Sequence, residues 1–407
     1  MSSAPVDTGA ARSSALVVTF ASPLYRGATV ALFLAGLGMS AAAPQIALFL
    51  VNDLHVSLTT AGLYYLANLT APVAGYLVGA RSDRTGRRLG LFRLCALAGF
   101  LGWLGIAFST QAWMPFVISA VVLAFAGAGG SQLFAAIHDD LQANHVPVGE
   151  EVVSIVRMAL TAGWIIGPVA GSFLAAAVGP RAMLVATALC TLAQLIPMGF
   201  LNSPRTPAMS AAASEHVVRR RGLRVMLPLL TFTGLYVLVY AGEPIKYAYL
   251  PIYMHDDLRL PGVVSGAVIG LQPLVELLLM PLAVVVARRI GAMRLMVLGA
   301  AFGVGANLCF ALTGNLVGMF AGQILMGGVW GVFAALGIIV AQRLLPGAVA
   351  TASAIFMSST AIASALGGLT GGVGVAVLGL PLVFLGPALF GLVATVGIAA
   401  MSRFRNA

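Results

Sequence analysis

The chain has 407 residues, of which 60% are hydrophobic and only 8% are charged, and its mean hydropathy is +1.01. A soluble domain carries roughly 25% charged residues, so the composition excludes one and indicates a polytopic membrane protein. The net charge of +10 does not indicate nucleic-acid binding, because the arginines gather between apolar runs on one predicted side of a membrane.

The apolar runs predict about twelve membrane-spanning helices, since about 20 residues cross a hydrocarbon core of roughly 30 Å. We therefore expect an all-α integral membrane protein. The predicted spans are 27–51, 57–80, 89–109, 112–138, 151–178, 181–201, 223–254, 261–288, 292–313, 315–343, 347–377 and 380–402.

A polar stretch over 202–222, with the basic run Arg219–Arg221, predicts a cytoplasmic linker that contacts anionic lipid. The arginines after the eighth span repeat the position of those after the second, which indicates two related halves with a substrate site between them. The expected parts are a disordered cytoplasmic tail over 1–22, a six-helix bundle over 23–201, the linker, a second bundle over 223–402 and a tail over 403–407.

The arginines also orient the chain. With the N-terminus in the cytoplasm, only Arg181 and Arg259 clearly fall on the outer side, as the positive-inside rule requires. We expect a multi-pass protein of the inner cell membrane with both termini in the cytoplasm.

The segment Gly79-Ala-Arg-Ser-Asp83-Arg84-Thr-Gly86-Arg87-Arg88 lies between the second and third predicted spans. Its arginines hold that helix end in the cytoplasm, Asp83 offers them a carboxylate partner, and Gly86 permits a tight turn. The alternative is a merely solvated basic loop. The segment resembles the loop signature of the major facilitator superfamily, which implies the major facilitator fold with two six-helix halves. It also implies a gating role for Asp83, Arg84, Arg87 and Arg88.

The fifth predicted span contains Gly163-Trp-Ile-Ile-Gly167-Pro168-Val-Ala-Gly171. Glycines four residues apart let a neighbouring helix approach closely, and Pro168 removes a backbone donor. The run resembles the motif of exporters within the superfamily and implies gating in an antiporter. Ordinary small-residue packing is the alternative.

A closer resemblance, over most of 30–400, is to the bacterial sugar efflux transporters. It rests on Ser131-Gln132-Leu-Phe-Ala135, Arg157, Trp164 to Pro168, Pro251, Leu260-Pro-Gly262 and Glu276. The resemblance implies export of small saccharides or glycoside-like molecules, driven by protons. The long N-terminal tail and Glu243-Pro-Ile-Lys246 depart from the pattern, and a multidrug exporter of the same superfamily is the alternative.

Glu276 lies midway along an apolar span, four residues after Gln272, so both side chains face one way. A charge at this depth is costly unless it is paired, hydrated or neutralised. We predict that Glu276 carries the coupled proton or accepts a bond from a substrate hydroxyl. A structural carboxylate is the alternative.

Arg157 keeps its charge and needs an anion, for which Asp139 or Asp140 at the end of the preceding span is the expected partner. Two roles for Arg157 remain equally open: a contact that joins two helices at the inner gate, and direct contact with the substrate.

The seventh span holds Tyr236, Tyr240 and Glu243 near Lys246, the only lysine of the chain. Tyrosine combines a flat apolar face with a hydroxyl, which suits a sugar ring, whereas Tyr249 and Tyr253 are expected in the interfacial belt. Asn68, Gln132 and Trp164 are further candidates for hydroxyl recognition, or else join helices. The glycine-rich run 367–374 predicts close helix packing.

No metal-ligand spacing and no nucleotide-binding motif occurs in the sequence. We expect a transporter and not an enzyme, without metal or cofactor. Its expected partners are a small-molecule substrate such as a sugar, protons and membrane lipids, and we expect a monomer.

Overall fold

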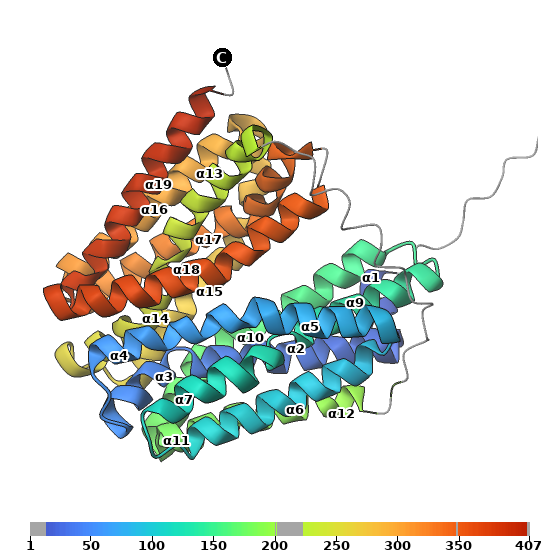
Figure 1. Cartoon of the computed structure of the whole chain (residues 1–407), viewed down its shortest axis with the longest axis horizontal. Helices are drawn as coiled ribbons and strands as arrows, with labels where there is room; N and C mark the ends of the chain where they lie inside the picture. The colour runs from blue at the N-terminus through green and yellow to red at the C-terminus, as the bar shows by residue number, and fades with distance from the viewer. Residues whose placement is uncertain (1–13, 200, 202–222, 347–348, 405–407) are drawn as a thin grey trace, which may run out of the picture.

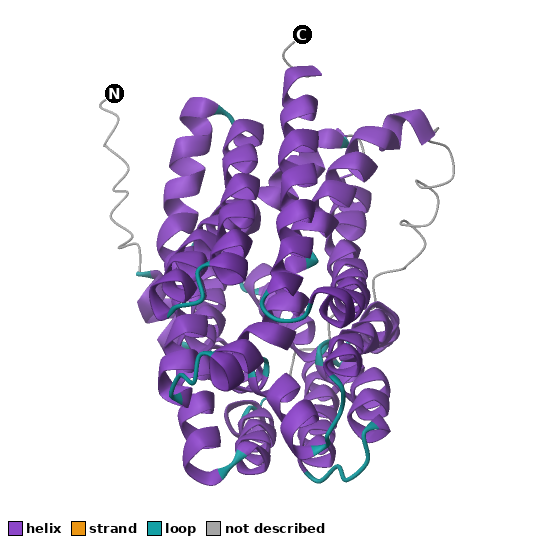
Figure 2. Ribbon diagram, turned by 90° about the vertical axis from the view of Figure 1, so that its left-hand side faces the viewer, coloured by secondary structure: helices purple, strands orange, loops and turns teal. Residues whose placement is uncertain are grey.

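The computed structural model describes residues 14–199, 201, 223–346 and 349–404. Every regular element in these ranges is helical (Figure 2), which confirms the all-α prediction. The expected linker over 202–222 lies outside the described residues, as do 1–13 and 405–407. The expected disorder before residue 22 is wrong for one segment, because Ala15–Ala21 form a helix.

Helices of the first half are α1 (Ala15–Ala21), α2 (Pro23–Ala42), α3 (Gln45–Leu48), α4 (Leu58–Leu63), α5 (Ala71–Thr85), α6 (Arg88–Ala107), α7 (Trp113–Ile118), α8 (Ala124–Ala126), α9 (Gly129–Ala143), α10 (Gly149–Val178), α11 (Pro180–Ala193) and α12 (Leu195–Met198). Those of the second half are α13 (Leu223–Tyr240), α14 (Gly242–Ile252), α15 (Gly262–Ile290), α16 (Ala292–Leu312), α17 (Leu316–Leu344), α18 (Val349–Leu378) and α19 (Leu385–Phe404). Short π or 3₁₀ segments join several of them, at Phe49–Asp53, Tyr64–Thr70, Ser119–Leu123, Tyr253–Asp257 and Leu382–Phe384.

Eleven helical stretches of the described chain are long and apolar enough to cross a membrane. The expected second span, 57–80, is not among the eleven. Its residues form α4, the 3₁₀ segment Tyr64–Thr70 and α5 without a break. Four threonines, Asn68 and a charged end reduce the apolar character of this run. Residues 58–85 therefore form a continuous helical run at the position of the second predicted span.

Each half has hydrophobic cores of its own. The largest buried cluster runs from Leu229 to Ile398, whereas three smaller clusters lie between Tyr25 and Met198. Figure 1 shows the first half below and the second half above, in contact at the left near α3, α4 and α14. The helices of the two halves diverge toward the right, where α1 and α9 lie.

Two glycine-lined seams join the halves. At Gly266 of α15 an added Cβ would lie 2.6 Å from the carbonyl oxygen of Pro168 in α10, and at Gly368 of α18 it would lie 2.9 Å from that of Gly62 in α4. Only glycine permits such backbone approach. The predicted close packing of the run 367–374 is confirmed.

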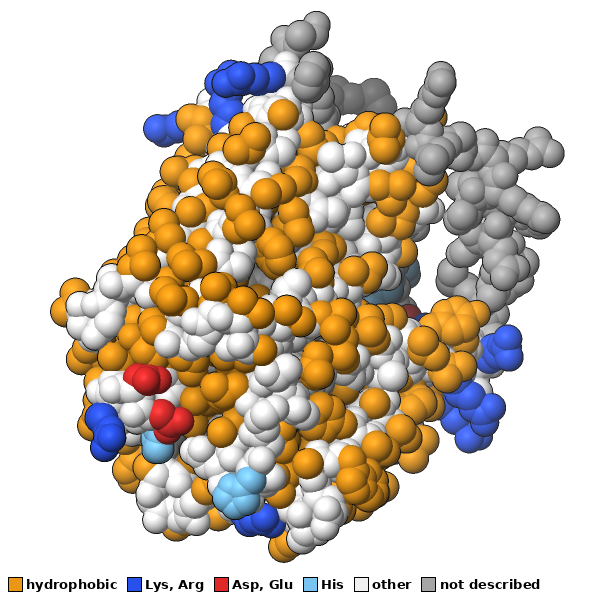
Figure 3. All heavy atoms as spheres, turned by 60° about the vertical axis from the view of Figure 1, so that its left-hand side comes forward, with side chains coloured by type: hydrophobic (Ala, Val, Ile, Leu, Met, Phe, Trp, Pro, Cys, Tyr) orange, Lys and Arg blue, Asp and Glu red, His pale blue; other side chains and the backbone are white. Residues whose placement is uncertain are grey.

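The outer surface is apolar over a broad area, as Figure 3 shows, with charged side chains at its edges. Many large aliphatic residues are exposed on it, for example Leu278, Val317 and Val396. A water-soluble monomer rarely exposes an apolar area of this size, whereas lipid tails solvate it.

Candidate functional site

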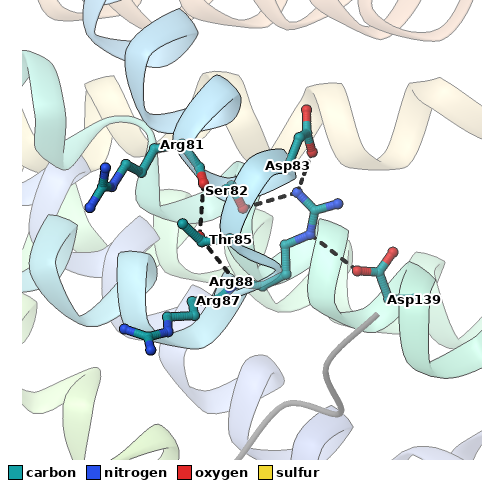
Figure 4. A network of polar contacts seen from close by, with 7 residues as sticks. All are labelled: Arg81, Ser82, Asp83, Thr85, Arg87, Arg88 and Asp139. Atoms are coloured by element: carbon teal, nitrogen blue, oxygen red, sulfur yellow. Dashed lines mark hydrogen bonds and ion pairs between the residues drawn. The ribbon is translucent and has the colours of Figure 1, made fainter. Parts of the chain in front are cut away.

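Arg88 is the centre of the network at the basic loop (Figure 4). Its Nη1 donates to Asp83 Oδ1 at 2.6 Å and to Ser82 Oγ at 2.9 Å, and its Nε donates to Asp139 Oδ2 at 3.1 Å. Gly86 ends α5 in the left-handed conformation, with φ of 63°, and this turn brings Arg88 back beside Asp83. Arg88 thereby ties the ends of α5, α6 and α9 together.

The arginine partner of Asp83 is therefore Arg88. Arg84 and Arg87 make no side-chain hydrogen bond with any described residue, and Figure 4 shows the Arg87 side chain pointing away from both carboxylates. Asp139 is 17% exposed and Asp83 is 57% exposed. Because solvent screens exposed ion pairs, the bond from Arg88 to Asp139 is stronger than the bond to Asp83. Asp139 lies outside the motif 79–88, so the motif alone does not predict this bond.

The expected pairing of Arg157 with Asp139 or Asp140 is wrong for the described residues, because both carboxylates have other partners. Asp140 accepts a 2.6 Å hydrogen bond from the hydroxyl of Tyr25 in α2, and Asp139 pairs with Arg88. The Arg157 guanidinium lies 5.7 Å from the ring centroid of Phe134. Tyr25 was not identified from the sequence, because it lies 115 residues from Asp140 along the chain.

The glycines of α10 pack against α2. A Cβ at Gly163 would lie 2.5 Å from the backbone nitrogen of Leu37, and one at Gly171 would lie 2.7 Å from the carbonyl oxygen of Ala41. At Gly167 it would overlap Ser40, whose hydroxyl donates to the Gly163 carbonyl at 3.1 Å. The predicted close helix approach is confirmed. Pro168 faces the other way, toward Gly266 of the second half.

A buried ionic cluster lies in the second half, at the break between α13 and α14. Pro244 has no N–H to offer the Tyr240 carbonyl, so α13 ends at Tyr240 and α14 begins at Gly242. On α14, Lys246 Nζ lies 2.8 Å from Glu243 Oε2 and 3.0 Å from Oε1. The Lys246 side chain is 1% exposed and the Glu243 side chain 9%.

Two further helices complete this cluster. Trp330 of α17 donates its indole N–H to Glu243 Oε1 at 2.6 Å, and Lys246 also donates to Gln272 Oε1 of α15. The ring of Tyr247 lies 4.4 Å from Lys246 Nζ, a cation–π distance. Lys246 and Trp330 were not among the predicted site residues. The position of Lys246 inside a span could have identified it, because an ionisable residue at this depth indicates a functional site.

Glu276 lies on α15 one turn after Gln272 and is half-buried. It interacts electrostatically with both Glu243 and Lys246. It makes no hydrogen bond with any residue that the structure describes, whereas Glu243 has two donors. Lys246 and Trp330 thus both donate to Glu243, and Glu276, the carboxylate that we predict to carry the coupled proton or to bind a substrate hydroxyl, accepts neither bond.

Aromatic side chains line one side of the ionic cluster. Tyr236 lies 5.9 Å from Tyr240 and 4.5 Å from Phe356, and Tyr240 lies 5.1 Å from Trp330, between ring centroids. The expected grouping of Tyr236 and Tyr240 beside Glu243 is therefore present, and Trp330 joins the two sets.

The candidates of the first half are placed differently. Asn68 donates to Ser364 Oγ of α18 at 2.7 Å and so lies at a seam between the halves. Gln132 is buried, and its Oε1 has no hydrogen-bond partner among the described residues. Trp164 is half-buried on α10.

The expectation for Tyr249 and Tyr253 was wrong. Both are buried, and the Tyr249 hydroxyl donates to the Leu58 carbonyl at 3.1 Å across a seam. Packing of α14 against α3 and α4 of the first half buries Tyr249, and Tyr253 lies in the core cluster of the second half. Periodicity reveals neither contact.

Comparison with known proteins identifies the family of the chain. The sequence model of the Major Facilitator Superfamily matches residues 28–318. Sugar efflux transporter A of Dickeya chrysanthemi is 28% identical over 345 residues, covering 84% of this chain and 86% of that protein. Sugar efflux transporter A of Escherichia coli is 25% identical over 357 residues, covering 86% and 88% respectively. The expected resemblance to sugar efflux transporters is confirmed.

Solved structures share the fold. The nucleoside transporter NupG superposes with a TM-score of 0.76 at 17% identity, over 94% of this chain and 99% of that one. A D-xylose-proton symporter superposes with a TM-score of 0.71 at 16% identity, over 92% and 96%. The chain belongs to the major facilitator superfamily, and it is a multi-pass membrane transporter rather than an enzyme.

Proposed function

We propose that this transporter exports small saccharides or glycoside-like molecules by proton antiport with alternating access. Its relatives named as sugar efflux transporters align over most of both chains. The ionic cluster supplies what a sugar needs for recognition: tyrosine and tryptophan rings for its apolar faces, and amide and carboxylate groups for its hydroxyls.

Glu276 carries the coupled proton in this proposal. The supporting observation is that Glu243 already accepts bonds from Lys246 and Trp330, whereas Glu276 has no such donor in the described chain. An unpaired carboxylate at this depth is costly, and either a proton or a substrate hydroxyl removes that cost. Arg157, Gln132 and Trp164 of the first half complete the proposed substrate path.

The basic loop serves as a gate. If the N-terminus is cytoplasmic, the loop lies at the cytoplasmic end, and the seams close the outer end. The helices of the two halves diverge toward the loop (Figure 1), which supports an inward-facing conformation in this proposal. In this proposal Arg88, with Asp83 and Asp139, releases α9 when the inner end closes. We further propose location in the inner cell membrane, both termini in the cytoplasm, and a monomeric unit.

Transport by everted membrane vesicles with an imposed pH gradient tests the proposal. Labelled saccharides should accumulate against their gradient, and a protonophore should abolish the accumulation. Vesicles without the protein provide the control. If lipophilic cations accumulate and saccharides do not, the sugar proposal is wrong, and the second candidate, a multidrug exporter, replaces it. The stacked rings of Phe232 and Phe356, which lie beside Tyr236 and carry no hydroxyl, favour that second candidate.

A further inference from the structure

A basic depression lies away from the proposed substrate site, at the end of the second half where α19 ends. Figure 1 shows this end of α19 beside the C-terminus. Its volume is about 520 Å³, which lies within the usual range for ligand pockets. Its walls come from the ends of α15, α16, α17 and α19. The lining residues are Arg289, Ile290, Gly291, Ala292, Met293, Arg294, Val340, Arg343 and Ser402.

Three guanidinium groups from three helices line this depression, and no described carboxylate lies among its lining residues. Arg289 ends α15, Arg294 lies in the first turn of α16, and Arg343 lies in the last turn of α17. None of them forms an ion pair or side-chain hydrogen bond with a residue in the described ranges. None of the lining residues is acidic. Arginine stays charged, so these groups repel one another unless an anion joins them.

The backbone adds donors on the same wall. Gly291, with φ of 92°, directly precedes α16 and has no side chain to cap it. The first N–H groups of α16, at Ala292, Met293 and Arg294, have no acceptor within the helix. They point toward the N-terminal side, where the helix dipole also favours negative charge.

We propose that this depression binds a phosphate group. Arginine offers paired N–H donors that match phosphate oxygens, and the helix N-terminus favours the same anion. The phosphate comes either from the headgroup of an anionic phospholipid or from a phosphorylated solute. The site does not depend on the identity of the exported substrate.

The test uses the full-length purified protein and two probes. Inorganic phosphate is added in detergent, and the melting temperature is compared with that in sodium chloride of the same ionic strength. Separately, the protein is extracted from phosphatidylcholine vesicles containing cardiolipin, and the retained cardiolipin is measured by mass spectrometry. The site variant is Arg289→Gln/Arg294→Gln/Arg343→Gln.

A matched variant removes the same charge elsewhere. Arg288 and Arg403 are sequence neighbours of lining residues but do not line the depression, and Arg26 lies in the other half. The control is therefore Arg288→Gln/Arg403→Gln/Arg26→Gln. A third variant, with lysine at the three site positions, keeps the charge but loses the paired donors. It is measured as well, and it replaces the glutamine variant if that one does not fold.

We expect about tenfold weaker phosphate or cardiolipin binding in the glutamine site variant, and a smaller loss in the lysine variant. The control should bind like the wild type. Binding of cardiolipin alone would identify a lipid headgroup as the source, and binding of inorganic phosphate alone would identify a soluble one. Equal losses in the site and control variants, or no response of the wild type to either probe, would overturn the proposal.

Discussion

The two halves hold their charged side chains at different depths. In the first half, Arg88 bridges Asp83 and Asp139 at helix ends, with side chains 17 to 57% exposed. In the second half, Lys246 and Glu243 pair inside a span with 9% exposure or less. Water can replace a lost partner in the first network but not in the second. The first is suited to opening and closing, and the second to a fixed site.

The loops of the repeat differ as well. The first contains Asp83, which pairs with Arg88, whereas the charged residues of the second are all arginines, at 288, 289 and 294. Without such a carboxylate, the guanidinium groups of Arg289 and Arg294 line a depression and form no ion pair with any residue in the described ranges. The acidic residue Asp83 thus distinguishes the first loop, which an ion pair holds, from the second loop, which lines a candidate anion site.

The largest expected effect is the loss of the buried cation. Lys246→Met leaves Glu243 buried without its counter-charge and should lower the free energy of unfolding by about 3 to 5 kcal/mol. Thermal unfolding in detergent measures it, with Lys246→Met/Glu243→Gln as the matched control that removes both charges. A double variant no more stable than the single one would show that the ion pair does not stabilise the second half.

Close packing in the first half is the next test. Gly167→Leu and Gly171→Leu should each cost about 1 to 3 kcal/mol, because the new side chain overlaps α2. Gly234→Leu in α13 is the control, since a Cβ there has no neighbouring atom within 4 Å. Unchanged stability together with normal gradient-driven export in both α10 variants would remove the argument for an exporter motif.

Glu276→Gln separates proton coupling from substrate binding in the second half. If Glu276 carries the proton, uphill transport should stop while counterflow exchange and binding persist. If it anchors a substrate hydroxyl, binding should weaken by about 1 to 3 kcal/mol, since a buried partner is lost. Substrate binding and counterflow in proteoliposomes distinguish these results. Wild-type values for all three measurements would make the residue structural.

The smallest effect is expected at the basic loop. Asp83→Asn should slow transport and leave substrate affinity within a few-fold, because an exposed pair contributes about 0 to 1 kcal/mol. Asp139→Asn should slow transport further, since its carboxylate is less exposed. Rates and affinities measured in parallel check this order. A large loss of affinity in Asp83→Asn would place the loop in the binding site.

Much of the architecture follows from the sequence, and the exceptions have physical causes. Eleven of the predicted spans are present as long apolar helices, whereas the run 58–85 carries a 3₁₀ segment that apolar length alone does not reveal. Glu243, Gln272 and the two tyrosines were predicted, and the structure brings them together. Trp330 was missed because its partner Glu243 lies 87 residues away along the chain.

By itself the sequence determined the membrane class, the helical fold and the basic-loop signature, because hydrophobic length, charge placement and turn chemistry are local properties. Only the tertiary structure decided which charges pair. Asp139 accepts a hydrogen bond from Arg88, and Lys246 donates to both Glu243 and Gln272. Glu276 has no hydrogen-bond partner in the described chain. These pairings depend on how closely helices distant in sequence pack against one another. Glycine contacts such as that of Gly266 with Pro168 set the distance between the helices.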